Sequence, residues 1–74
     1  MSKADDYYSV VTEVNEVLNR VFNDESAGNA WFFYPCYKGL NGDVPATNMR
    51  KGIEKAREVL KVLKELEVNN GRDN

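Results

Sequence analysis

Residues 5–22 read DDYYSVVTEVNEVLNRVF, and the spacing of the apolar side chains in this stretch decides the fold class. The apolar residues recur at alternating steps of three and four: Tyr7, Val10 or Val11, Val14, Val17 or Leu18, and Val21. This period predicts an amphipathic helix, because a half-buried strand would need strict alternation. Asp5 and Asp6 suit its first turn, where free N–H groups and the helix dipole favour carboxylates.

A second helix is predicted to begin near Glu25 and to end before Pro35. Asn23 and Asp24 both suit its N-cap, because their side chains can accept a hydrogen bond from a backbone N–H of the first turn. Pro35 ends the helix, since proline lacks the N–H donor and disfavours helical angles in the preceding residue. Gly28 would allow another helix to approach closely. Ala27, Ala30, Trp31 and Tyr34 share one face of this helix, and the part with Ala27, Ala30 and Trp31 is expected to face the core.

Residues 35–45, PCYKGLNGDVP, are predicted to form an irregular loop between the second and last helices. Gly39, Asn41 and Gly42 tolerate left-handed backbone angles that most residues resist. An Asn-Gly pair between two strands would favour a hairpin, but the flanking residues do not alternate. We therefore expect a loop pinned to the core by its one plain apolar side chain, Leu40.

The last helix is predicted to follow a short turn at Pro45, with Thr47 or Asn48 as its N-cap. Asn70 and Gly71 are the expected residues at its C-terminus. Its wide apolar face contains Met49, Ile53, Ala56, Val59, Leu60, Val62, Leu63 and Leu66 or Glu67.

The chain is short enough for a single all-α domain over residues 1–74, with residues 69–74 as a mobile tail. We expect a small bundle of three main helices plus a short turn or helix. A chain of this size buries only about 60% of its unfolded surface, so small cores often depend on a disulfide, a metal or a partner. Cys36 is the only cysteine and histidine is absent, which excludes an internal disulfide and leaves too few ligands for structural zinc.

The charge pattern favours neither nucleic acid nor membrane as a partner. The net charge is −2, and the basic residues of the last helix are interleaved with acids, so no basic stripe is available for phosphates. Pairs at helical spacing, such as Glu54 with Arg57 and Lys61 with Glu65, are typical of a solvated face. The chain has neither a signal-peptide pattern nor about 20 consecutive apolar residues. We therefore expect a cytoplasmic protein.

Enzymatic activity is not expected. The sequence has no histidine, no glycine-rich phosphate loop and no His/Cys metal cluster, and its paired acids fall at helix starts. Cys36 lacks the histidine that commonly activates a catalytic thiolate. The sequence thus predicts no catalytic residue, no metal site and no cofactor.

Consecutive aromatic residues at 31–34 point in different helical directions, and one helix of a small domain cannot bury its whole circumference. Trp31 is expected in the core, because large aromatics dominate small cores. The others, including Phe32, either extend the core or form an interface, and exposed aromatic clusters favour the interface. The candidate partner-binding residues are Phe33, Tyr34 and Tyr37, with Lys38, Asn41 and Asp43 as a polar rim around them. Solvation of the loop is an alternative explanation for these three polar residues.

The order of motifs between Val21 and Leu66 resembles the toxin-binding domain of the MbcA/ParS/Xre antitoxins. VFNDESAGNAW is followed by a proline four residues after the tryptophan, then by GLNGDVP, then by a glycine that opens the amphipathic segment KGIEKAREVLKVL. The matching positions are Asn23 and Asp24 at the helix cap, Ala27 and Trp31 in the core, Pro35 at the helix stop, Leu40, Gly42 and Pro45 in the turn, and Gly52, Val59 and Leu63 on the closing helix.

This resemblance implies an all-helical domain that commonly dimerises and shields the active site of a RES-domain toxin, an enzyme that consumes or transfers from NAD. The family's N-terminal helix-turn-helix has no room here, since one helix precedes the matching region. Two alternatives therefore stay open: a phage-encoded inhibitor of a host defence system, similar to anti-CRISPR proteins, and a purely structural homodimer that pairs through its aromatic residues.

Overall fold

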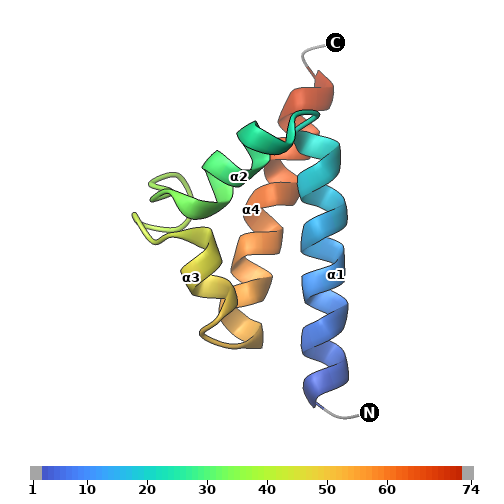
Figure 1. Cartoon of the computed structure of the whole chain (residues 1–74), viewed down its shortest axis with the longest axis vertical. Coiled ribbons are helices and arrows are strands. Elements are labelled where there is room, and N and C mark those ends of the chain that lie inside the picture. The colour runs from blue at the N-terminus through green and yellow to red at the C-terminus, as the bar shows by residue number, and fades with distance from the viewer. Residues whose placement is uncertain (1–2, 73–74) are drawn as a thin grey trace.

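The computed structural model describes the backbone of residues 3–72 and the side chains of residues 6–69, and it confirms a small all-α bundle. Between residues 3 and 72 it contains three main helices and one short helix, and the only β-type pairing there is an isolated bridge between Cys36 and Asp43 (Figure 1). The helices are α1 (Lys3–Val21), α2 (Glu25–Phe33), α3 (Pro45–Met49) and α4 (Ile53–Arg72).

The two long helices, α1 and α4, lie side by side and run in the same direction, while α2, a loop and α3 return the chain from the end of α1 to the start of α4 (Figure 1). The predicted apolar faces of both helices are confirmed. Since burying one valine or leucine side chain contributes about 1.5–3 kcal/mol, this seam is the main source of stability. The buried core is Val10, Val14 and Val17 of α1, Ala56, Val59, Leu60, Val62 and Leu63 of α4, and Leu40 and Met49 between them.

The predicted limits of α2 are confirmed at both ends. The Asp24 side chain caps the helix by accepting a hydrogen bond from the backbone N–H of Ser26, with an Oδ1–N distance of 3.1 Å. Tyr34, which precedes Pro35, has an extended backbone with φ −115° and ψ 156°. Proline therefore stops the helix by the expected mechanism.

The predicted start of the last helix at Thr47 or Asn48 is wrong. These residues lie inside the separate helix α3, and α4 begins at Ile53. Gly52 has φ +132°, a backbone conformation that interrupts a helix and that side-chain-bearing residues rarely adopt. Its carbonyl oxygen accepts the first hydrogen bond of α4 from the N–H of Ala56, at 3.0 Å.

The C-terminal end of α4 extends beyond the predicted one. The helix continues through Asn70 and Gly71 to Arg72, so residues 69–72 of the expected mobile tail are helical. Asp73 and Asn74 lie outside the described residues.

Two ion pairs join α1 to α4. Arg20 donates to Glu67 through Nε–Oε2 at 2.6 Å and Nη2–Oε1 at 3.3 Å, and Lys64 Nζ lies 2.8 Å from Glu13 Oε2. A third pair, Lys55 with Glu58, lies within α4.

The pairs expected between Glu54 and Arg57 and between Lys61 and Glu65 are not among those that the described residues form. Two of the three observed pairs instead join α4 to α1, because the packing places Arg20 of α1 within reach of Glu67 and Glu13 of α1 within reach of Lys64. Helical spacing alone could not identify these partners.

Acid is expected to remove the contribution of the Arg20–Glu67 pair. The hydrogen bond from Arg20 lowers the pKa of the Glu67 carboxyl below its ordinary value of 4.5. A lowered folded-state pKa gives stability that is present above the unfolded-state pKa and is lost as the pH falls through the folded-state value. Glu67→Gln should therefore flatten the fall of the urea midpoint below about pH 4.5. Glu54→Gln, which changes a carboxylate outside these pairs, is the control and should leave that slope unchanged.

Replacement of Gly28 by alanine is expected to stabilise the protein by about 1 kcal/mol, because glycine inside a helix is that much less favourable than alanine. A Cβ atom on Gly28 would lie 3.5 Å from Phe22 Cβ and 3.7 Å from Leu18 Cγ, which are ordinary contacts. The buried site therefore has room for a methyl group. Urea unfolding should show a higher midpoint with an unchanged slope; a lower midpoint would mean that the helices cannot accept the methyl group.

Candidate partner-binding surface

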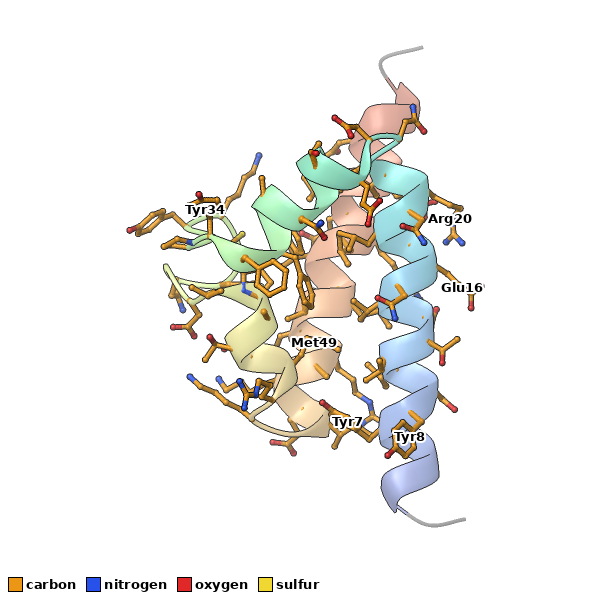
Figure 2. All side chains as sticks on the ribbon, viewed as in Figure 1. Tyr7, Tyr8, Glu16, Arg20, Tyr34 and Met49 are labelled. Carbon is orange, nitrogen blue, oxygen red and sulfur yellow. The ribbon has the colours of Figure 1, made fainter. Side chains whose placement is uncertain are left out.

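Three large aromatic side chains are exposed where α2 ends and the following loop begins. Phe33 is 61% exposed, Tyr34 65% and Tyr37 81%. We call these three residues the aromatic surface. Figure 2 shows Tyr34 at the outer end of α2, on the side of the molecule away from α1.

The aromatic surface is exposed because α2 is short and buries one side only. Trp31 is half-buried and packs against the core, with its ring 6.2 Å from that of Phe22. Phe32 is also half-buried and meets Phe33 edge to face, with ring centroids 5.3 Å apart. Phe33 therefore points outward while Trp31 and Phe32 pack inward, as the sequence predicts for consecutive aromatic residues on one helix.

The predicted core face of α2 is only partly right. Trp31 packs inward, but Ala27 and Ala30 are exposed, and the buried residue of this helix is Gly28. Gly28 has no side chain, so the side of α2 that carries it can pack closely against Leu18 and Phe22. The alanines consequently turn toward solvent.

The irregular loop predicted over residues 35–45 is observed at residues 34–44, since Pro45 begins α3, and Leu40 anchors the loop with only 3% of its surface exposed. The backbone of Cys36 closes the loop: its N–H donates to Asp43 O, and its carbonyl accepts from Gly42 N, both at 2.9 Å. The residues with positive φ are those predicted, Gly39 (105°), Asn41 (55°) and Gly42 (88°).

The Tyr37 ring lies against the loop backbone although most of the side chain is exposed. A Cβ atom added to Gly42 would lie 2.9 Å from Tyr37 Cε1 and 3.2 Å from Cδ1, so the ring lies directly against the Gly42 backbone. Any residue larger than glycine at position 42 would displace it. The aromatic surface thus includes a side chain whose position is set by backbone geometry.

The predicted rim residues lie on the same loop as Tyr37. Lys38 and Asn41 are exposed, whereas Asp43 is half-buried and engages Cys36 through its backbone. Their role in partner binding stays a prediction. Of the predicted structural residues, Trp31 is half-buried, Leu40 and Pro45 are buried, Pro35 is exposed, and Gly42 and Gly52 have positive φ.

A small cleft of about 80 Å³ opens between the end of α2, the loop and α4. Cys36, half-buried in its wall, donates its thiol to Lys38 O at 3.4 Å. The sequence did not predict this cleft, because its walls come from segments that are distant along the chain. The lining residues are Trp31, Cys36, Lys38, Val62, Glu65, Leu66 and Asn69.

Two polar features of α3 were also not predicted from the sequence. Asn48 is fully buried, and among the described residues neither its Oδ1 nor its Nδ2 has a hydrogen-bond partner. Next to it, the Met49 carbonyl accepts a hydrogen bond from the Tyr7 hydroxyl (Figure 2). The only sequence feature that indicated burial of Asn48 was its position next to apolar Met49. The preference of asparagine for N-cap positions explained the residue equally well.

Over the part of the chain that the structure describes, no three metal-ligating side chains of His, Cys, Asp or Glu lie together. The described helices include none with the length and apolar character needed to cross a membrane. No protein-family model, no curated protein and no solved structure matches the chain.

Proposed function

We propose that this domain is a non-enzymatic protein-binding module that binds and inhibits a partner protein. The observation that carries the proposal is the aromatic surface: three neighbouring aromatic side chains of a small domain, each more than 60% exposed. Tyrosine and phenylalanine are enriched in protein interfaces, and a few large side chains commonly provide most of the binding energy.

The size of the aromatic surface indicates how the contact extends. One aromatic side chain buries about 150–250 Å² when fully covered, so three partly exposed ones fall short of the roughly 800 Å² per partner of a stable interface. The partner must therefore also cover neighbouring residues. The rim residues Lys38 and Asn41 and the cleft beside Trp31 are adjacent in the fold and provide that area.

The class of partner follows from the resemblance to the MbcA/ParS/Xre antitoxins. We propose a cytoplasmic toxin enzyme of the RES type, whose active site the bound domain would cover. In this role the domain needs no catalytic residue and no cofactor of its own, because covering the toxin's active site is enough to inhibit it.

The test combines growth rescue with pull-down. The chain is co-expressed with a RES-type toxin encoded beside it, and the tagged protein is then used to capture that toxin. Tyr34→Ala/Tyr37→Ala should weaken capture at least tenfold, since hot-spot truncations of this kind commonly cost about 2 kcal/mol or more. Tyr8→Ala is the matched control, because Tyr8 is 67% exposed but lies on α1.

Each outcome discriminates between the hypotheses. Growth rescue that depends on Tyr34 and Tyr37 supports the antitoxin role. Capture of a host defence component in place of a toxin would favour the phage-encoded inhibitor, and self-association alone would favour the structural homodimer. Equal capture by the double variant and the wild type would exclude the two tyrosines from the contact.

A further inference from the structure

Asn48 is the one described residue whose buried side chain has unpaired polar atoms. Its amide is fully buried within α3, and both the carbonyl oxygen and the NH₂ group lack a partner among the described residues. An unmade hydrogen bond of a buried group shifts an equilibrium by a factor of roughly 5 to 150 toward any state in which water reaches that group. Exposure of Asn48 is thus favoured relative to exposure of an apolar residue.

The ends of the helix that carries Asn48 are held by few hydrogen bonds. α3 has only five residues, and its N-cap, Val44, provides no side-chain hydrogen bond. Its end is held by two backbone bonds of 3.1 Å, from Arg50 N to Thr47 O and from Lys51 N to Asn48 O. Nothing lies within 4 Å of the Cβ position of Gly52, the residue that joins this end to α4.

α3 is directly continuous with the loop that carries Tyr37. Val44 O accepts a hydrogen bond of 3.0 Å from Asn48 N in α3. Val44 directly follows Asp43, which forms the bridge with Cys36 that closes the loop. Figure 1 shows the loop and α3 together on the side of the molecule away from α1. The buried side chains that restrain this unit are Leu40, Pro45 and Met49, together with Asn48 itself.

We propose that α3 is a conformational latch that opens separately from global unfolding, hydrates the Asn48 amide and releases the loop that presents Tyr37. Opening would break the Tyr7–Met49 hydrogen bond and the short ladder of α3, while the α1–α4 seam stays intact. On the basis of the proposed function, the latch would control how much of the population presents the complete aromatic surface.

Native-state hydrogen exchange of the isolated protein tests the latch. The reporter amides of α3 and the loop are Asn48, Lys51, Cys36 and Gly42, whose N–H groups donate backbone hydrogen bonds. The amides of Leu60 and Leu63 in α4 report global unfolding. We expect the α3 and loop reporters to be at least tenfold less protected than those of α4 in the wild-type protein.

Two variants separate local opening from global unfolding. Asn48→Leu removes the unpaired amide and should raise the protection of the α3 and loop reporters at least tenfold. Gly28→Ala, which stabilises α2 where it packs against Leu18 and Phe22, should slow exchange in α4 by about fivefold, as expected for about 1 kcal/mol, and leave the α3 reporters unchanged. If Asn48→Leu does not fold, Asn48→Ala replaces it with the same expected direction.

Three results would overturn the latch: α3 amides as protected as those of α4, no response of α3 to substitution of Asn48, or loop amides that do not follow α3. The measurement needs no partner protein. Its failure would therefore leave the proposed binding function standing, and a failed capture experiment would leave the latch standing.

Discussion

Gly39→Ala is expected to destabilise the domain by about 3 kcal/mol, which would lower the thermal midpoint by more than about 10 °C for a chain of this size. Two costs add at this position. Gly39 has φ +105°, where a residue with a side chain is strained by about 1–3 kcal/mol. The new Cβ would also lie 2.7 Å from Val62 Cγ2, and overpacking of this kind costs a further amount of about 1–3 kcal/mol.

The chain offers a control for each cost. Gly52→Ala introduces the strained backbone alone, because φ is +132° and nothing lies within 4 Å of the added Cβ. It should destabilise less than Gly39→Ala. In a Val62→Ala background the clash disappears, so Gly39→Ala should then cost about as much as Gly52→Ala.

Thermal and urea unfolding followed by circular dichroism would measure each of these proteins. Equal effects of Gly39→Ala in the two backgrounds would show that the loop can move away from Val62 without cost. The result also bears on the aromatic surface, because a loop displaced at Gly39 carries Tyr37 with it.

The helices could be predicted from the sequence because they depend on local chemistry. The three- and four-residue spacing of the valines in α1 identifies its buried face whatever α1 packs against. In the same way, Asp24 and Pro35 set the ends of α2 through interactions with adjacent backbone groups. The positive φ angles of Gly39 and Gly42 follow from a glycine-rich loop that must turn sharply.

The features that escaped prediction depend on how distant segments meet. Ala27 and Ala30 have the spacing of a core face, but they are exposed. Gly28 is buried instead, because its side of α2 contacts Leu18 and Phe22. Asn48 is suited to an N-cap by its side chain, yet Gly52 breaks the helix four residues later and leaves Asn48 inside α3.

In the candidate site, too, the features set by local sequence could be predicted and those set by distant segments could not. The exposure of Phe33, Tyr34 and Tyr37 follows from crowding on one short helix and its loop, so it could be predicted. The cleft beside them could not, because it requires the position of α4 relative to Trp31. The parallel orientation of α1 and α4 could not be predicted either, because the amphipathic pattern of a helix is the same for a parallel and an antiparallel partner.

Asn48→Leu is expected to raise the free energy of unfolding by about 1–3 kcal/mol, against the usual direction of substitutions in a core. The reason is the unpaired amide: Asn48 is fully buried with neither polar atom satisfied among the described residues. In the unfolded chain water satisfies both atoms, so folding loses that hydration without replacing it. Leucine has nearly the same branched shape, and it also has the higher helix propensity.

Two further variants show which property of the introduced leucine matters, and urea unfolding with linear extrapolation measures each of them. Asn48→Ala also removes the amide but leaves a cavity, so its gain should be smaller than that of Asn48→Leu. Asn48→Asp keeps the shape and buries a carboxylate, whose desolvation exceeds that of an amide, and it should destabilise the domain strongly at neutral pH. A gain in both Asn48→Leu and Asn48→Ala together with a loss in Asn48→Asp would show that the polarity of the buried group sets the cost, because shape is held nearly constant across the asparagine, aspartate and leucine series. A loss of stability in Asn48→Leu would instead show that the amide makes favourable contacts in the folded protein, and it would remove the physical basis for a latch at α3.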